Sequence, residues 1–244
     1  MPPKTKSSPG KFAIDAHKFL IAEFAPLADP DKAIEMAAYM KTDMPFWGIQ
    51  KPDREPIYRQ LAKDFAPTNH DDYSQVILKL WKGKHREEKY AALDYAVRCK
   101  KFIAPSMIPL YEQLVREGQW WDLVDVLATL LVGVAFLQDQ KNVKPIMKEW
   151  IDDDNMWIRR TAILSMNKHK EKTDERLLYD FCLRRAHEKE FFIRKAIGWA
   201  LREYSYKAPD SVITFLKTNR SKLSPLSYRE GAKQLVRNGL MELD

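Results

Sequence analysis

Residues 157–164 read WIRRTAIL and residues 192–199 read FIRKAIGW. The two stretches align at an offset of 35 residues, which places Ile158 on Ile193 and Arg159 on Arg194. Further steps of the same size extend the alignment towards the N-terminus, to Asp125 and then to Tyr90 inside EEKYAALDYA. A period of this length is typical of stacked helical hairpins. We therefore predict an all-α fold, an α-solenoid built from helix pairs in series.

The rest of the sequence has the same helical character. Glycine is scarce, with 8 residues in 244, and apolar residues recur at three- and four-residue steps. Pro30, Pro105, Pro209 and Pro225 lie where helices are expected to start. This spacing predicts helices over residues 12–24, 31–41, 73–81, 87–99, 108–115, 120–132, 157–166, 176–186, 191–204, 211–218 and 227–236.

The charge is basic overall, with 41 Lys and Arg against 34 Asp and Glu and a formal net charge of +7. Such a balance favours a polyanionic partner, either nucleic acid or an anionic membrane surface. Residues 1–11, MPPKTKSSPGK, carry lysines, Ser and Pro but no apolar core. We expect a disordered basic tail at residues 1–11 and a single domain over residues 12–244.

Several other classes of protein fit the sequence poorly. Cys99 and Cys182 form no CxxC, which fits a reducing compartment. The apolar run 123–137 contains Asp125 and is short for a membrane span. The five histidines lack ligand spacing, so no metal is expected. We expect a soluble cytoplasmic protein in which the charge runs HREEK (85–89) and NKHKEK (167–172) are solvated faces.

The repeat brings charged and aromatic residues onto one surface. Asp125, Arg160 and Lys195 occupy equivalent positions on three successive repeats. Trp121 precedes Asp125 by four residues, and Trp199 follows Lys195 by four, so each lies one helical turn away on the same face. The spacing predicts a patch of two indoles, one carboxylate and two cations. We expect no second carboxylate in this patch.

Each of these residues also has a structural interpretation. Asp125 lies in an apolar run where an unpaired charge is costly, so we expect Arg160 to pair with it. Such a pair is equally compatible with a purely structural role. Trp120 and Trp121 diverge by about 100° on a helix, so one packs inward and Trp121 faces out. Trp81 and Trp150 are interpreted as core residues.

Several segments resemble the AlkD-type DNA alkylation-repair glycosylases, in order along nearly the whole chain. They are YMKTDMPFWGIQKPDR (39–54), WWDLVD (120–125), DNMWIRRTAIL (154–164), EFFIRKAIGWALREY (190–204) and LSPLSYRE (223–230). The resemblance implies a HEAT-like α-solenoid whose concave basic groove holds duplex DNA. It implies removal of N3- and N7-alkylated purines by a monomer, without metal or organic cofactor and without flipping the base.

The resemblance also assigns roles to individual residues. Asp125 resembles the catalytic carboxylate, with Trp121 and Trp199 as the aromatic residues beside it, and Arg160 resembles an arginine that holds the DNA backbone. Three further residues match groove positions, and these are Tyr39, Gln50 and Arg202. Lys195 joins the DNA-binding set through the repeat. Gly231, within the last helix, departs from the family pattern and is expected to loosen that helix slightly.

Two functions remain open at this point. The first is a DNA glycosylase, for which a carboxylate and two indole faces stabilise the cationic sugar that forms as the glycosidic bond breaks. The second is a non-catalytic HEAT-like module that binds distorted DNA or a protein partner. The glycosylase is favoured because Trp121, Asp125, Arg160 and Trp199 are all present.

Overall fold

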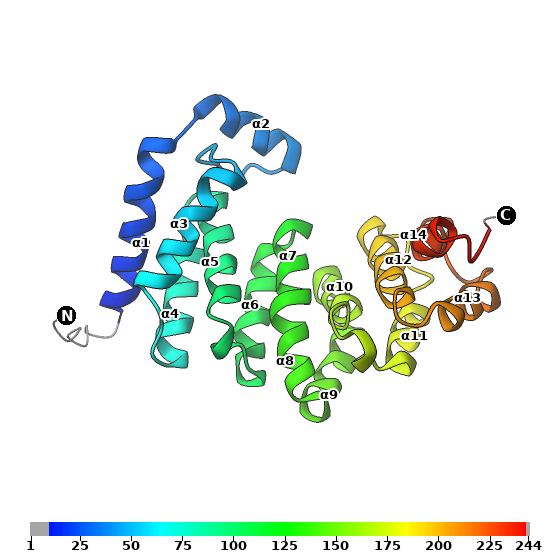
Figure 1. The fold of residues 1–244 in the computed structure, drawn as a ribbon. Coiled ribbons are helices and arrows are strands. Elements are labelled where there is room, and N and C mark those ends of the chain that lie inside the picture. The colour runs from blue at the N-terminus through cyan, green and yellow to red at the C-terminus, as the bar shows by residue number, and fades with distance from the viewer. Residues whose placement is uncertain (1–9, 243–244) are drawn as a thin grey trace. The chain divides into compact units, whose positions relative to one another are not determined.

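The fold is all-helical, as predicted. The structure is a computed structural model that describes residues 10–242, and every regular element in that range is a helix (Figure 1). Contacts between Cα atoms group the chain into two compact units, one ending at Ile103 and the other beginning at Ala104. The single domain over residues 12–244 and the solenoid with its concave groove stay predictions. Of the expected tail, residues 1–9 lie outside the described residues, and Lys11 already belongs to the first helix.

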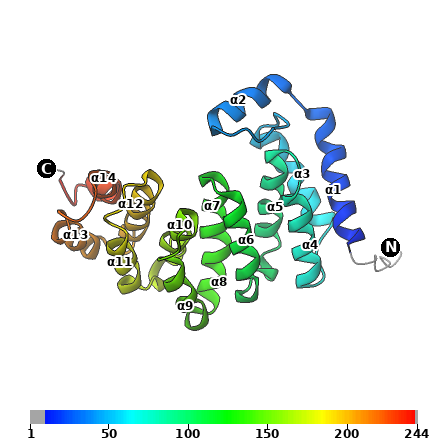
Figure 2. The ribbon, with the colours of Figure 1, turned by 180° about the vertical axis from the view of Figure 1, so that it is seen from behind.

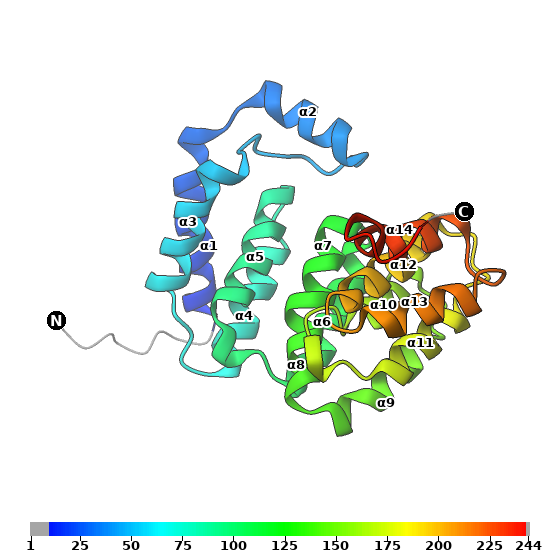
Figure 3. The ribbon, with the colours of Figure 1, turned by 45° about the vertical axis from the view of Figure 1, so that its right-hand side comes forward.

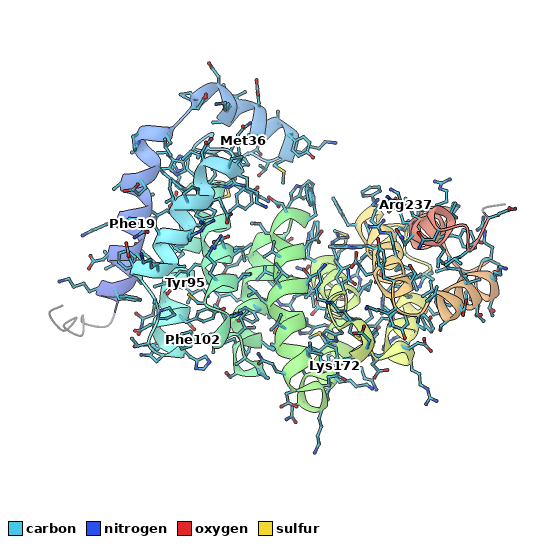
Figure 4. The ribbon with its side chains drawn as sticks, viewed as in Figure 1. Phe19, Met36, Tyr95, Phe102, Lys172 and Arg237 are labelled. Atoms are coloured by element: carbon cyan, nitrogen blue, oxygen red, sulfur yellow. The ribbon has the colours of Figure 1, made fainter. Side chains whose placement is uncertain are left out.

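The first unit packs its helices around an aromatic core. Its α-helices are α1 (Lys11–Phe24), α2 (Pro30–Met40), α3 (Lys51–Asp64), α4 (His70–Trp81) and α5 (Arg86–Arg98), with short 3₁₀ turns at Ala25–Leu27 and Lys100–Phe102. Helices α1, α3, α4 and α5 pack together, as Figure 3 shows. Tyr73 stacks on Tyr95 and on Phe102, and the last two are labelled in Figure 4. Trp81, at the end of α4, is buried, as predicted.

The second unit carries the predicted patch. Its helices are α6 (Ile108–Gly118), α7 (Trp121–Val126), α8 (Gly133–Gln138), α9 (Gln140–Trp150), α10 (Met156–Leu164), α11 (Glu175–Arg184), α12 (Phe191–Ser205), α13 (Pro209–Thr218) and α14 (Pro225–Arg237). A π-helical segment, Leu127–Val132, joins α7 to α8, and 3₁₀ turns cover Pro105–Met107 and Lys170–Lys172. The views from the front and from behind agree that α10 lies beside α12, and α12 beside α14 (Figures 1 and 2).

The 35-residue repeat is visible in the hydrogen bonds of two equivalent arginines. Arg159 donates from Nη1 to the carbonyl oxygen of Asp153 at 2.7 Å, six residues earlier. Arg194 donates from Nε to the carbonyl oxygen of Glu188 at 3.0 Å, also six residues earlier. Each arginine therefore ties the first turn of its helix to the preceding loop. The sequence alignment of α10 with α12 thus corresponds to a shared local structure.

Prolines mark the helix starts as the sequence predicts. Pro30, Pro209 and Pro225 occupy the first position of α2, α13 and α14, and Pro105 opens the 3₁₀ turn before α6. At this position proline loses nothing, because its missing N–H has no partner inside the helix.

Helix α8 lies outside the predicted ranges as a continuation of the helix predicted over 120–132, whereas α3 and α9 were not predicted at all. Both contain an interior proline, Pro56 in α3 and Pro145 in α9, which removes one hydrogen bond between turns and usually ends a helix. Both helices nevertheless bury one stripe of side chains. In α9 the buried stripe is Val143, Met147 and Trp150, and Trp150 is a core residue as predicted. Burial of this face outweighs the lost hydrogen bond.

The helical stretch from Trp121 to Gln138 is the most apolar in the described chain. By length and composition alone it satisfies the criteria for a membrane-crossing helix, yet 56% of it is buried inside the protein. It packs against α6 and α10. This is the pattern of a core helix, in which protein side chains cover the apolar surface.

The charge run HREEK is not a solvated face, so that expectation is wrong. Arg86, Glu87 and Glu88 are all buried. The Glu87 carboxylate accepts hydrogen bonds from the backbone N–H groups of Trp47, Gly48 and Ile49 at 2.9, 3.0 and 3.2 Å. The backbone donors replace the water that a buried carboxylate loses, which makes this burial tolerable.

The second charge run, NKHKEK, is only partly solvated. His169 is buried, and its Nε2 lies 2.8 Å from the carbonyl oxygen of Gly133. Lys168 and Lys170 are exposed. The expectation of a solvated face therefore holds for the lysines and is wrong for Asn167 and His169, which are buried. The His169 ring pairs with a buried carbonyl.

Candidate active site

The two tryptophans at the start of α7 diverge, as predicted. Trp120 adopts an extended backbone and caps the helix, whereas Trp121 is its first residue. The Trp120 ring packs against Trp157 and Phe192, with ring centroids 6.0 and 5.4 Å apart. Trp121 is 37% exposed. One indole therefore braces α10 and α12, and the other is available to a ligand.

Asp125 is the second-last residue of α7, two positions before the π-helical segment begins at Leu127. The hydroxyl of Thr129 donates to the carbonyl oxygen of Asp125 at 2.7 Å. A threonine hydroxyl in a helix often makes this bond to the carbonyl four residues earlier. Segments of π-helix occur often at functional sites. Neither the helical spacing nor the repeat predicts this segment.

Asp125 and Arg160 form the ion pair that the sequence predicts. Arg160 Nε donates to Asp125 Oδ1 at 2.8 Å, and Nη2 donates to Oδ2 at 2.9 Å. The Asp125 side chain is 20% exposed and the Arg160 side chain is 5% exposed. The third guanidinium nitrogen, Nη1, donates to the carbonyl oxygen of Phe192. The bidentate geometry fixes both oxygens of the carboxylate and so orients Asp125.

Burial dominates the electrostatics of Asp125. Burial raises the pKa of this carboxyl above its ordinary value of 3.8, and the hydrogen bonds and charge of Arg160 offset only part of that rise. The carboxylate is therefore more basic than a solvated Asp. A positive charge or a proton close to this carboxylate is therefore stabilised more strongly than it would be by a solvated Asp.

Helix α12 contributes three residues at helical spacing to the site. Lys195, Trp199 and Arg202 lie four and three residues apart and share one face of the helix. The indole Nε1 of Trp199 donates to Glu203 Oε1 at 3.1 Å. A carboxylate at this end of the indole holds the ring in place and increases its electron density.

Glu230 is the residue of this site that the sequence reasoning missed. Its carboxylate binds Lys195 Nζ at 3.0 Å and Arg202 Nη1 at 2.7 Å. Burial acts to raise the pKa of Glu230, but the two cations outweigh it and lower the pKa below the usual value. Glu230 is therefore ionised at neutral pH and is not suited to be a general acid. The expectation that no second carboxylate joins the patch is therefore wrong, since Glu230 lies one further 35-residue step after Lys195, on α14, to which the alignment was not extended.

Gly198 allows Glu230 to come this close. An added Cβ at Gly198 would lie 2.4 Å from the Cβ of Glu230 and 2.9 Å from the carbonyl oxygen of Ser227. Only glycine fits at this crossing of α12 and α14. The sequence signal that could have found Glu230 is its spacing of 35 residues from Lys195, one repeat. Gly231 is also buried, with Leu201 and Leu216 3.3 Å from an added Cβ. Gly231 therefore allows α14 to pack closely, whereas the sequence predicted only that this glycine loosens the helix.

Nine side chains line one pocket of about 290 Å³ in the second unit. Its lining residues include six that the sequence singled out, namely Trp121, Asp125, Arg160, Lys195, Trp199 and Arg202, together with Phe191, Phe192 and Glu230. The pocket combines indole faces and a fixed carboxylate with accessible cations. It can therefore bind a negatively charged group on its cations while stabilising a positive charge near its carboxylate.

Tyr39 and Gln50 belong to the first unit, and the structure does not bring them into this pocket. Tyr39 lies on α2 and is 78% exposed, and Gln50 is the exposed residue directly before α3. The backbone bonds to Glu87 anchor the loop that leads to Gln50. The DNA-binding role of Tyr39 and Gln50 stays a prediction.

Comparisons with known proteins agree with this architecture. Residues 20–235 match the family model of the DNA alkylation repair enzymes. A solved structure described as a predicted DNA alkylation repair enzyme from Enterococcus faecalis is 32% identical and superimposes with a TM-score of 0.78. The match covers 86% of this chain and 97% of that one. No curated protein matches. On the extent of these matches, the chain belongs to the DNA alkylation repair enzyme family and has a role in the repair of alkylated DNA.

Proposed function

We propose that this protein is a monofunctional DNA glycosylase that removes N3- and N7-alkylated purines from duplex DNA. The observation that carries the proposal is the pocket in which Trp121, Trp199 and the oriented carboxylate of Asp125 meet. Alkylation at N3 or N7 places a positive charge on the purine and weakens its bond to the sugar. Breaking that bond develops positive charge on the deoxyribose, in the manner of other glycoside hydrolyses.

Asp125 and the indoles act on that developing charge. The carboxylate lies where it can stabilise a cationic sugar, and electron-rich ring faces attract cations. The C1′–N bond breaks with its electron pair going to the base, which becomes neutral. Water adds to C1′, and its proton passes to Asp125 and then to solvent. The raised pKa of Asp125 suits a group that accepts this proton.

The cations of the pocket have a separate role in the proposal. Lys195 and Arg202 would contact DNA phosphates, which supply affinity without reading sequence. An already cationic base is a good leaving group and needs neither protonation nor a metal. The base itself therefore does not have to enter the pocket, and we propose that it stays stacked. The proposal includes a monomer working on chromosomal DNA in the cytoplasm.

The test is direct. The protein is incubated with duplex DNA carrying one N7-methylguanine or one N3-methyladenine, and free base is measured by chromatography. We expect release of free base and an alkali-labile abasic site, at the same rate with and without a chelator. Duplex binding without release from either substrate would defeat the proposal and favour a non-catalytic binding module.

A further inference from the structure

Glu230 occupies both of the pocket's partly exposed cations at once. Its Oε1 binds Lys195 Nζ at 3.0 Å, and its Oε2 binds Arg202 Nη1 at 2.7 Å. The three side chains come from two helices, α12 and α14, that cross closely at Gly198. This is a bridge in which one carboxylate neutralises part of the charge of two cations.

Arg160, the third cation of the pocket, is less accessible to a ligand than Lys195 and Arg202. The Arg160 side chain is only 5% exposed and binds Asp125 in bidentate geometry. Lys195 and Arg202 are 37% and 24% exposed. The two accessible cations are therefore the ones from which a phosphate would gain most, and both are held by Glu230.

A phosphate that approaches this pocket must compete with Glu230 for Lys195 and Arg202. We propose that Glu230 is a specificity-determining counter-ion that weakens the contact between these cations and DNA phosphate. Phosphate contacts are the same on damaged and intact DNA. Restraining them lowers the affinity for ordinary duplex, and contacts that depend on the lesion then decide a larger share of binding.

The inference rests on the proposed function only in that the ligand is duplex DNA. It requires no excision. It differs from a structural role for Glu230, in which the carboxylate merely joins α12 to α14. A structural bridge would stabilise the fold and leave the salt dependence of DNA binding unchanged, whereas a competing counter-ion alters that dependence.

The experiment measures the affinity of Glu230→Gln for an undamaged duplex across a series of salt concentrations. We expect binding at about 0.1 M salt to tighten roughly fivefold, the scale of one partly exposed ion pair. Each phosphate contact adds about 0.9 to the slope of log K against log salt. We therefore expect a slope steeper by about one to two.

A matched control removes the same charge elsewhere in the second unit. Glu171 pairs with Lys207 at 2.6 Å and does not line this pocket. Glu171→Gln makes the same change in net charge and also frees one lysine. We expect its effect on affinity and on slope to be much smaller. An equal effect in both variants would assign the gain to net charge and overturn the inference.

A second variant keeps the test valid if Glu230→Gln is less stable. Lys195→Gln is compared in the wild-type protein and in the Glu230→Gln background, at a temperature where melting curves show all variants folded. We expect Lys195→Gln to cost more affinity when Glu230 is absent. Equal costs, or a slope unchanged by Glu230→Gln, would overturn the counter-ion role. If the wild type binds duplex but releases no base, the proposed glycosylase fails and this inference stands.

Discussion

Arg160 binds both oxygens of Asp125 through parallel hydrogen bonds, Nε to Oδ1 at 2.8 Å and Nη2 to Oδ2 at 2.9 Å. The two residues lie 35 positions apart in the sequence, one repeat. This geometry serves two purposes that experiments can separate. It satisfies a half-buried carboxylate, and it fixes the direction in which that carboxylate faces the pocket.

Asp125→Asn tests the catalytic role. The change preserves the shape of the side chain but removes the charge that would stabilise a cationic sugar. We expect single-turnover excision of N7-methylguanine to slow by roughly 10²-fold or more. Affinity for undamaged duplex should hold or rise slightly, because a negative charge has left a surface that binds a polyanion. A folded variant that excises at a near-normal rate would refute the assignment.

Arg160→Ala tests the structural part of the pair. Removing the guanidinium leaves the Asp125 carboxylate and the Phe192 carbonyl without their partner. Loss of one member of a buried pair typically costs about 3 kcal/mol, so the free energy of unfolding in urea should fall on that scale. The double variant Arg160→Ala with Asp125→Asn should recover part of the loss. No recovery would mean that the two residues are not energetically coupled.

The pH dependence of excision follows from the raised pKa of Asp125. Because a protonated carboxyl cannot stabilise a cation, excision should fall as the pH drops through this pKa, above the ordinary value of 3.8. The contribution of Asp125 to the stability of the fold depends on pH in the opposite direction. A folded-state pKa above the unfolded one contributes stability below pH 3.8 that is lost as pH rises through the folded pKa.

Protonation of Asp125 favours the folded protein. The loss of activity at acid pH is therefore not caused by an unfolding that Asp125 brings about. Single-turnover rates across pH, with circular dichroism as a check on folding, measure the decline. Asp125→Asn should show no such limb. The same limb in this variant would assign the titration to another group.

Glu203→Gln tests whether the carboxylate beside Trp199 supports catalysis. Glu203 Oε1 accepts the indole N–H at 3.1 Å, and Gln keeps an acceptor while losing the charge. A less electron-rich indole attracts the sugar cation less, so excision should slow by roughly two- to fivefold with duplex affinity unchanged.

The control for this prediction is Lys168, which lies 3.8 Å from the other oxygen of Glu203. Lys168→Met leaves the charge of Glu203 intact and should not slow excision. A parallel loss in both variants would indicate a general disturbance of α12 instead.

The sequence by itself determined the helical class and six of the nine residues that line the pocket. Three- and four-residue spacing reports which face of each helix is buried, and the repeat places equivalent residues on neighbouring helices. Those two regularities were enough to pair Asp125 with Arg160 and to bring Trp121 and Trp199 to one pocket.

Only the tertiary structure decided the rest, because the remaining contacts depend on how closely the helices pack. Glu230 reaches Lys195 from α14 only because Gly198 lets the two helices cross closely. Glu87 is buried because a loop some forty residues earlier offers three N–H groups to its carboxylate. Local patterning cannot reveal the partners of Glu87, since the free energy that holds this buried charge comes from groups distant in the sequence.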